Sequence, residues 1–185
     1  MRIRYDPTCP TAATPSHKLQ ETPRVFASDL ASNAMLLGYA EMLIADIDDA
    51  DFTAQPLPGI NHPAWILGHL AMAADGAIGL LGGEKLTTPD WTAKFGRDSK
   101  LSSNRSDYPA RDEIVRIFRE THARVRELAT NADLERMQRP NPNARLRDRL
   151  PTIGEMCTFL MTGHLGTHLG QLSAWRRMRG LPPLF

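Results

Sequence analysis

The sequence predicts an all-α four-helix bundle. Four segments of helical length each carry a stripe of apolar residues that recurs every three or four positions, as in helices packed on a core. No segment of useful length alternates apolar and polar residues as a strand does, and there is no internal repeat. A chain of 185 residues is long enough for one full core and too short for two ordinary domains.

Residues 25–48 are expected to form the first helix. Its apolar stripe comprises Phe26, Leu30, Leu37, Ala40, Ile44 and Ile47. The acidic run 46–52 ends this helix, and the proline-rich segment 55–59 leads to the next. Residues 1–22 are rich in Pro, Thr and Ser, so we expect a poorly ordered lead before a single domain over 23–185.

The second helix is expected over residues 63–82. Asn61 or His62 should cap it, because Pro63 suits a first helical turn, and a glycine pair closes it. The connection that follows, residues 83–109, has no sustained periodicity. Connections of this length in small domains often cover a functional site, and we expect the same here.

Ser106 or Asp107 is expected to open the third helix ahead of a proline. Its apolar stripe comprises Ile114, Ile117, Phe118, Thr121, Val125 and Leu128. A second long connection, residues 133–151, is basic. Thr152 then starts a Thr-Ile-Gly-Glu capping box, and the fourth helix runs to Arg179.

Bulk properties favour a cytoplasmic protein. A formal charge of +1 argues against nucleic acid or an acidic membrane surface as a partner. Residues 1–10 are polar, without the apolar stretch of a secretory signal. Cys157 is expected in the core and Cys9 as a free terminal thiol. The second helix approaches the length of a membrane span, but Asp75, His69 and several glycines weigh against one.

Three histidines indicate a metal site. His164 and His168 lie four residues apart, on what a regular helical wheel makes the inner, apolar face of the fourth helix. His69 lies in the middle of the apolar second helix. Buried imidazoles need partners, and three neutral nitrogen ligands leave coordination positions open, as catalytic metal sites do. Zinc, nickel, iron and copper all suit such ligands.

Residues near these histidines suggest supporting roles. His62 is expected as a cap or at the mouth of the site rather than as a fourth ligand. Gln171 follows His168 by three positions and can hydrogen-bond a ligand histidine or a bound water. Trp65 is expected in the wall of the site, while His122 should lie in solvent or beside a ligand.

Other chemistries lack support. His17 falls in the N-terminal lead, and Asp46 or Asp75 can act as a base only if the fold turns it inward. There is no Gly-rich phosphate loop, nucleophile elbow or Cys-x-x-Cys motif. The arginines of residues 136–149 fit a solvated loop, or the mouth of a substrate site, better than a nucleic-acid surface, because no aromatic residues are interleaved with them.

Three segments carry a family resemblance. Residues 61–70 (NHPAWILGHL), 164–172 (HLGTHLGQL) and 179–183 (RGLPP) resemble the DinB-like metal-binding four-helix bundles, over about residues 25–183. The resemblance implies an up-down-down-up bundle, often a homodimer, that holds zinc, nickel or iron. The ligands it implies are His69, His164 and His168.

The resemblance also implies a range of activities. Members of the family include thiol-dependent S-transferases and isomerases that use bacillithiol, mycothiol or glutathione. The leading hypothesis is therefore an S-transferase that uses a metal-activated thiolate and a small-molecule substrate. The alternatives are a non-catalytic metal-binding or stress-response protein and a hydrolase that uses metal-bound water, since a fold does not name a reaction.

Overall fold

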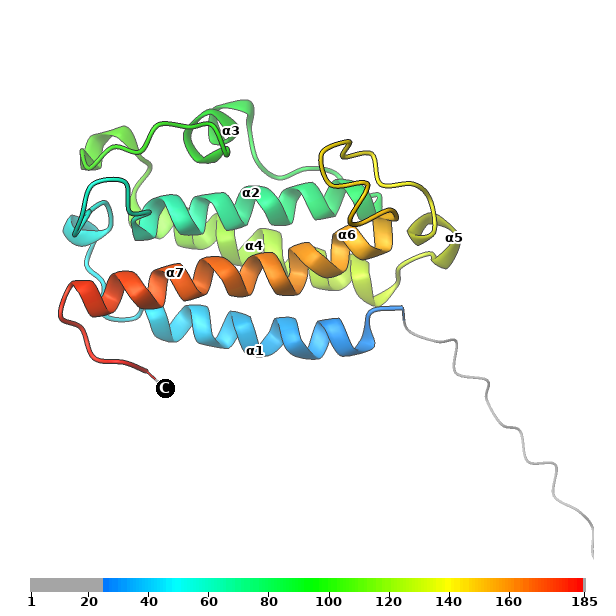
Figure 1. Ribbon diagram of the computed structural model, residues 1–185, viewed down its shortest axis with the longest axis horizontal. Helices are drawn as coiled ribbons and strands as arrows, with labels where there is room; N and C mark the ends of the chain where they lie inside the picture. Colours follow the sequence, from blue (N-terminus) through cyan, green and yellow to red (C-terminus); the bar gives the residue numbers. More distant parts are fainter. Residues whose placement is uncertain (1–24, 185) are drawn as a thin grey trace, which may run out of the picture.

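Four long helical segments run side by side in the computed structural model, which describes residues 25–184 (Figure 1). They are α1 (Ala27–Ile44), α2 (Pro63–Leu81), α4 (Arg111–Thr130) and the continuous run of α6 (Ile153–Phe159), the π-helical turn η3 (Leu160–His164) and α7 (Leu165–Met178). The described part of the chain contains no strand, which confirms the all-α prediction. The N-terminal lead, with His17 and Cys9, lies outside the described residues.

The helices follow the up-down-down-up order that the resemblance implies. In Figure 1, α1 and the α6–α7 run point one way along the bundle, and α2 and α4 point the other. Because α2 and α4 are parallel neighbours, the chain between them must return along the length of the bundle. This return gives the long connection after α2 its position over the outer side of that helix.

Both long connections contain short helices that the sequence analysis missed. The connection after α2 holds α3 (Pro89–Phe95), and the one after α4 holds α5 (Leu134–Met137). Helices this short do not repeat an apolar stripe, so periodicity cannot reveal them. Instead α3 is fixed by tertiary contacts, because Trp91 and Phe95 are buried and the Trp91 indole N–H donates to the Gly68 carbonyl at 2.9 Å.

The predicted start of the third long helix was wrong. Ser106 and Asp107 lie in a separate 3₁₀ turn. The helix α4 begins at Arg111, and its N-cap residue makes no side-chain hydrogen bond. The Asp49 carboxylate accepts a hydrogen bond from the Arg111 backbone N–H at 2.8 Å and pairs with the Arg105 guanidinium. A residue from the α1–α2 connection, distant in sequence, thus satisfies the N-terminus of α4.

Local signals predicted three other helix ends correctly, namely both ends of α2 and the start of α6. His62 caps α2, and its Nδ1 accepts a hydrogen bond from the Trp65 backbone N–H at 3.2 Å. Gly82 ends α2 with a φ of 95°, a conformation that glycine adopts without strain. Thr152 and Glu155 form the predicted capping box of α6. The first helix ends at residue 44 rather than 48.

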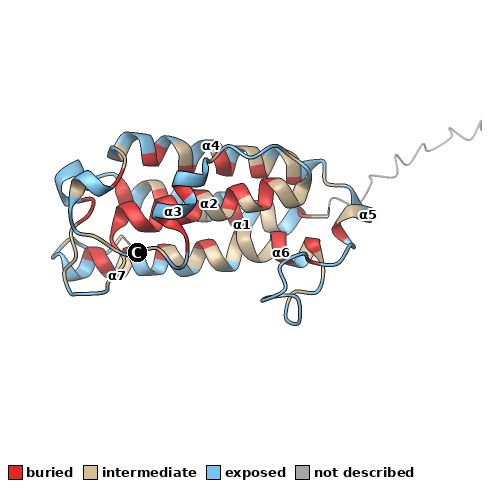
Figure 2. Cartoon of the chain, turned by 90° about the horizontal axis from the view of Figure 1, so that it is seen from above, coloured by how far each residue is buried: buried red, intermediate tan, exposed pale blue. Residues whose placement is uncertain are grey.

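The most buried of the long helices is α2 (Figure 2). Its length and its mean hydropathy of 1.5 meet the criteria for a membrane span, yet 67% of the span is buried inside the bundle. Asp75 is buried on this helix, where its carboxylate accepts hydrogen bonds from the Leu86 N–H and the Thr87 hydroxyl, each at 2.6 Å. The Asp75 carboxylate is therefore turned to the start of the following connection, which it fixes.

The C-terminal halves of α1 and α7 are joined by a buried arginine. Arg176 is 1% exposed and donates to the Leu43 carbonyl at 2.9 Å and to both carboxylate oxygens of Asp46. The hydrogen bond from Arg176 lowers the pKa of Asp46. Asp46, which the sequence left open as a base, thus has a structural role.

Gly68 is the position where α3 approaches α2 most closely. A Cβ atom there would lie 2.3 Å from the Phe95 ring, so Gly68→Ala must displace α3. We expect this variant to lose about 1–3 kcal/mol of unfolding free energy through overpacking. Urea denaturation measures the change.

Gly76→Ala in the same helix is the matched control, because no atom lies within 4 Å of its Cβ position. It should gain roughly 0.5–1 kcal/mol from helix propensity. Equal stabilities for the two variants would contradict the packing described here.

Candidate metal centre

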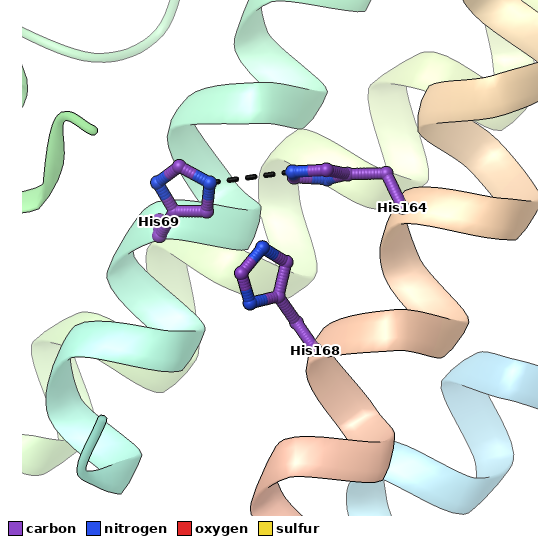
Figure 3. A group of neighbouring side chains, drawn as sticks. All are labelled: His69, His164 and His168. Atoms are coloured by element: carbon purple, nitrogen blue, oxygen red, sulfur yellow. Dashed lines mark hydrogen bonds between the residues drawn. The ribbon is translucent and has the colours of Figure 1, made fainter. Parts of the chain in front are cut away.

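His69, His164 and His168 point toward one another between α2 and the α6–α7 run (Figure 3). The Nε2 atoms of His69 and His164 are 3.3 Å apart, and each ring offers one nitrogen within 4.8 Å of the others. The ring centroids are 4.6–5.2 Å apart. The structure thus gathers the three histidines that the sequence singled out into a cluster that can hold a metal ion.

The π-helical turn η3 decides how His164 and His168 face the bundle. Before it, the buried positions of α6 are Ile153, Met156 and Cys157, and after it those of α7 include Leu165, Leu169 and Leu172. A regular helix cannot align these two sets, because the extra residue of a π-turn advances the buried face by about 100°. Both histidines lie half-buried beside this face, on the side of the helix that faces His69 (Figure 3).

The ring of His69 is fixed on both its edge and its face. Its Nδ1 lies 2.8 Å from the Phe95 carbonyl oxygen, so Nδ1–H donates there and Nε2 turns an electron pair toward the cluster. Trp65 stacks on the ring at a centroid distance of 4.6 Å and an interplanar angle of 9°. The Trp65 indole donates to the Ser99 hydroxyl at 2.8 Å. The connection after α2 thus covers the site, as expected.

The ring of His168 is fixed by Gln171. The Nδ1 atom of His168 lies 3.0 Å from Gln171 Oε1, and the same oxygen accepts a hydrogen bond from the Asn61 amide at 3.1 Å. The hydrogen bond from a cluster histidine to Gln171 that the sequence suggested is therefore present. Asn61, considered as a helix cap, instead ties the start of α2 to α7.

His164 and His122 each have buried ring nitrogens. Within residues 25–184, His164 Nδ1 and both ring nitrogens of His122 are buried and have no partner. His122 is 3% exposed and packs against Phe118 at a centroid distance of 4.5 Å. Of the two positions expected for His122, the one in solvent was therefore wrong. It is buried on α4 and interacts electrostatically with His164.

Burial keeps these imidazoles neutral. Desolvation, reinforced by the neighbouring rings, lowers the pKa of His164 to about 3 and that of His168 to about 4. Desolvation also lowers the pKa of His69, and it lowers the pKa of His122 to about 3. Because neutral imidazole is the form that binds metal ions, the cluster is ready to accept one at neutral pH.

The cluster opens into a cavity of about 780 Å³. Trp65, Leu146 and Phe159 give it apolar walls, while Arg97 and the arginines of the connection before α6 give it positive charge. Both long connections therefore form the mouth of the site, as the sequence analysis suggested.

Some residues considered from the sequence lie apart from the cluster. His62 caps α2 and is fully buried, so it is a cap and not a mouth residue. Cys157 is in the core as expected, where burial raises the pKa of its thiol to about 12. Sequence reasoning missed the Phe95 carbonyl, because a backbone acceptor leaves no signature in the side chains.

These features define a class of protein: a four-helix bundle in the up-down-down-up order, with a three-histidine cluster that can hold a metal at the base of a cavity. A family model described as the DinB superfamily matches residues 37–172, and the chain belongs to this family. No curated protein and no solved structure gives a significant match.

The metal-free protein should lose stability as the pH falls from 7 to 5.5. Histidines have a pKa of about 6.5 in the unfolded chain. The buried rings of His122, His164 and His168 have a lower pKa in the folded state, so the unfolded chain takes up protons first. This stability is fully present above the unfolded pKa and declines below it. Urea denaturation with a chelator present measures the trend.

His122→Leu is the informative variant for this pH dependence, because it removes one buried titrating ring outside the cluster. Its stability should fall less steeply over the same pH range. Wild-type stability that stays flat or rises on acidification would contradict the assignment of neutral, desolvated rings.

Gln171→Ala should weaken metal binding by about 10–100-fold, as the loss of a hydrogen-bond partner of a metal ligand usually does. The physical reason is that the His168 ring loses the acceptor that sets its orientation and tautomer. Competition with a chromogenic chelator measures the affinity. Gln138→Ala, an exposed position away from the cluster, serves as the control, and equal affinities in the two variants would refute the role of Gln171.

Proposed function

We propose that this protein is a metal-dependent S-transferase that activates a low-molecular-weight thiol. In this proposal His69, His164 and His168 hold a divalent transition metal, with zinc, nickel or iron as candidates. The observation that carries the proposal is the convergence of three neutral imidazoles, with ligand atoms within 4.8 Å, at the base of an open cavity. Membership in the DinB superfamily supports it.

Three protein ligands suit a reactive site better than a structural one. Structural zinc sites use four protein ligands, whereas catalytic sites use three and keep a position for substrate. A metal ion bound here would lower the pKa of a bound thiol, so that the sulfur reacts as a thiolate at neutral pH.

The residues of the cavity have defined tasks in this reaction. Trp65 and Phe159 form apolar walls that limit water around the sulfur. The hydrogen bonds of His69 to Phe95 and of His168 to Gln171 hold the ligand nitrogens in place. The thiol proton passes to solvent through the open mouth. The sulfur then forms a bond to an electrophilic carbon, and the leaving group departs with its electron pair.

The proposal assigns the protein to the cytoplasm, where low-molecular-weight thiols are kept reduced. Such a site is served by a freely diffusing small molecule. It needs neither nucleic acid nor a membrane as a partner.

The variant His168→Ala should bind metal more than about 100-fold more weakly than wild type. This loss is larger than the one caused by removal of a hydrogen-bond partner of a ligand. The ring is half-buried, so this substitution should leave the fold intact. Elemental analysis of protein purified without added metal measures the content. His62→Asn is the matched control, because asparagine also caps helices and His62 is outside the cluster.

Turnover is tested with metal-loaded wild-type protein, several low-molecular-weight thiols and a panel of electrophiles. We expect a thioether product that requires both metal and thiol and is lost in His168→Ala. Metal retention in His168→Ala would remove the proposed site. Bound metal without turnover would favour a non-catalytic metal-binding protein, and ester or amide cleavage without thiol would favour a hydrolase.

A further inference from the structure

Three arginines at the cavity beside the histidine cluster have guanidinium groups without a partner among the described residues. Arg97 lies just after α3, and Arg145 and Arg149 lie in the connection before α6. All three line the cavity and are exposed, and none makes a side-chain hydrogen bond or ion pair with residues 25–184. Eight other arginines each pair with a carboxylate.

The positive charge of this cavity is not balanced by any acidic residue that lines it within residues 25–184. No Asp or Glu of the described chain lines it, so three positive charges face the same space in a chain whose formal net charge is only +1. Clefts lined by one sign of charge attract ligands of the opposite sign. A surface loop that served only solubility would not need to direct its unpaired charges at the site.

The loop that carries Arg145 and Arg149 has a defined conformation. Asn141 is fully buried, and its side chain donates to the Leu150 carbonyl at 2.9 Å and accepts from the Asn143 N–H at 2.9 Å. The Arg147 guanidinium donates to the Asn141 carbonyl at 2.6 Å. Arg147 therefore braces the loop internally, while the arginines two positions before and after it line the cavity.

From this arrangement we propose that the cavity binds a small organic oxyanion, with Arg97, Arg145 and Arg149 as its recognition residues. The inference rests on the proposed function in one respect, namely that the anion belongs to the thiol or its electrophile. Guanidinium groups bind carboxylates and phosphates through paired hydrogen bonds. The apolar walls suit the body of such a ligand, and its sulfur or electrophilic carbon lies toward the histidines.

The test uses cobalt(II)-loaded protein, in which thiolate binding to the metal produces a near-ultraviolet charge-transfer band. N-acetylcysteine and N-acetylcysteine amide are the probes, because they differ only in a carboxylate and a neutral amide. In wild-type protein we expect the acid to bind at least about tenfold tighter, the size of one charge-assisted hydrogen bond. Added sodium chloride should reduce this preference by screening.

The double variant Arg145→Gln/Arg149→Gln should lose the preference for the acid while it keeps the charge-transfer band. Arg177 is an exposed arginine of α7 outside the cavity, without an ion pair among residues 25–184, and Arg177→Gln should behave as wild type. A comparison of ratios between proteins cancels the difference in thiol pKa between the two probes. Equal ratios in the wild type and the double variant would overturn the inference and leave the metal site intact.

Calorimetry without thiol separates this inference from the proposed function. Succinate and inorganic phosphate are titrated into wild-type and double-variant protein, and the stronger binder indicates which oxyanion the site prefers. If no charge-transfer band appears with either thiol, the proposed thiol chemistry fails. Binding of an anion to wild type but not to the double variant would still support the arginine site, and no binding of either anion would refute it.

Discussion

The site depends on one constraint: three neutral imidazoles must each turn an electron pair toward the same point. A neutral imidazole carries one N–H, so each outward nitrogen has to hold the proton and the inward one has to be free. The Phe95 carbonyl and the Gln171 side-chain oxygen impose this tautomer on His69 and His168. The helix α3 meets that requirement for His69, because it supplies the Phe95 carbonyl. Asn61 contributes for His168, because it donates to the Gln171 oxygen.

The same constraint explains why the site lies against α2, the most buried of the long helices. Desolvation keeps the pKa of the imidazoles low, so proton uptake does not compete with a cation at neutral pH. Burying polar rings without partners is unfavourable by about 1–3 kcal/mol per group. Both ring nitrogens of His122 and the Nδ1 atom of His164 are buried in this way, without a partner in the described chain. The extensive apolar packing around α2 offsets such terms, which suits a fold that holds reactive groups on rigid helices.

Features that depend on nearby sequence were predictable, and features that depend on distant contacts were not. The caps at His62 and Thr152 follow from side chains within three residues of the helix start. The start of α4 depends instead on Asp49, about sixty positions away in sequence. The π-turn before α7 is equally hidden, since no residue type specifies it. The wheel therefore found the histidines, which lie half-buried at the edge of the core. The family resemblance supplied the helix order, which spacing alone had left open.

The helix order explains which groups of the site come from the long helices and which come from the connections. Because α2 and α4 are parallel neighbours, the chain must travel back along α2, and this return places α3 and Arg97 beside His69. The connection before α6 approaches the same cavity from the other side, with Arg145 and Arg149. The long helices thus supply the histidines, while the connections supply most of the other groups that line the cavity. Such an arrangement allows the lining of the cavity to change through substitutions in loops, without disturbing the nitrogen geometry that the helices maintain.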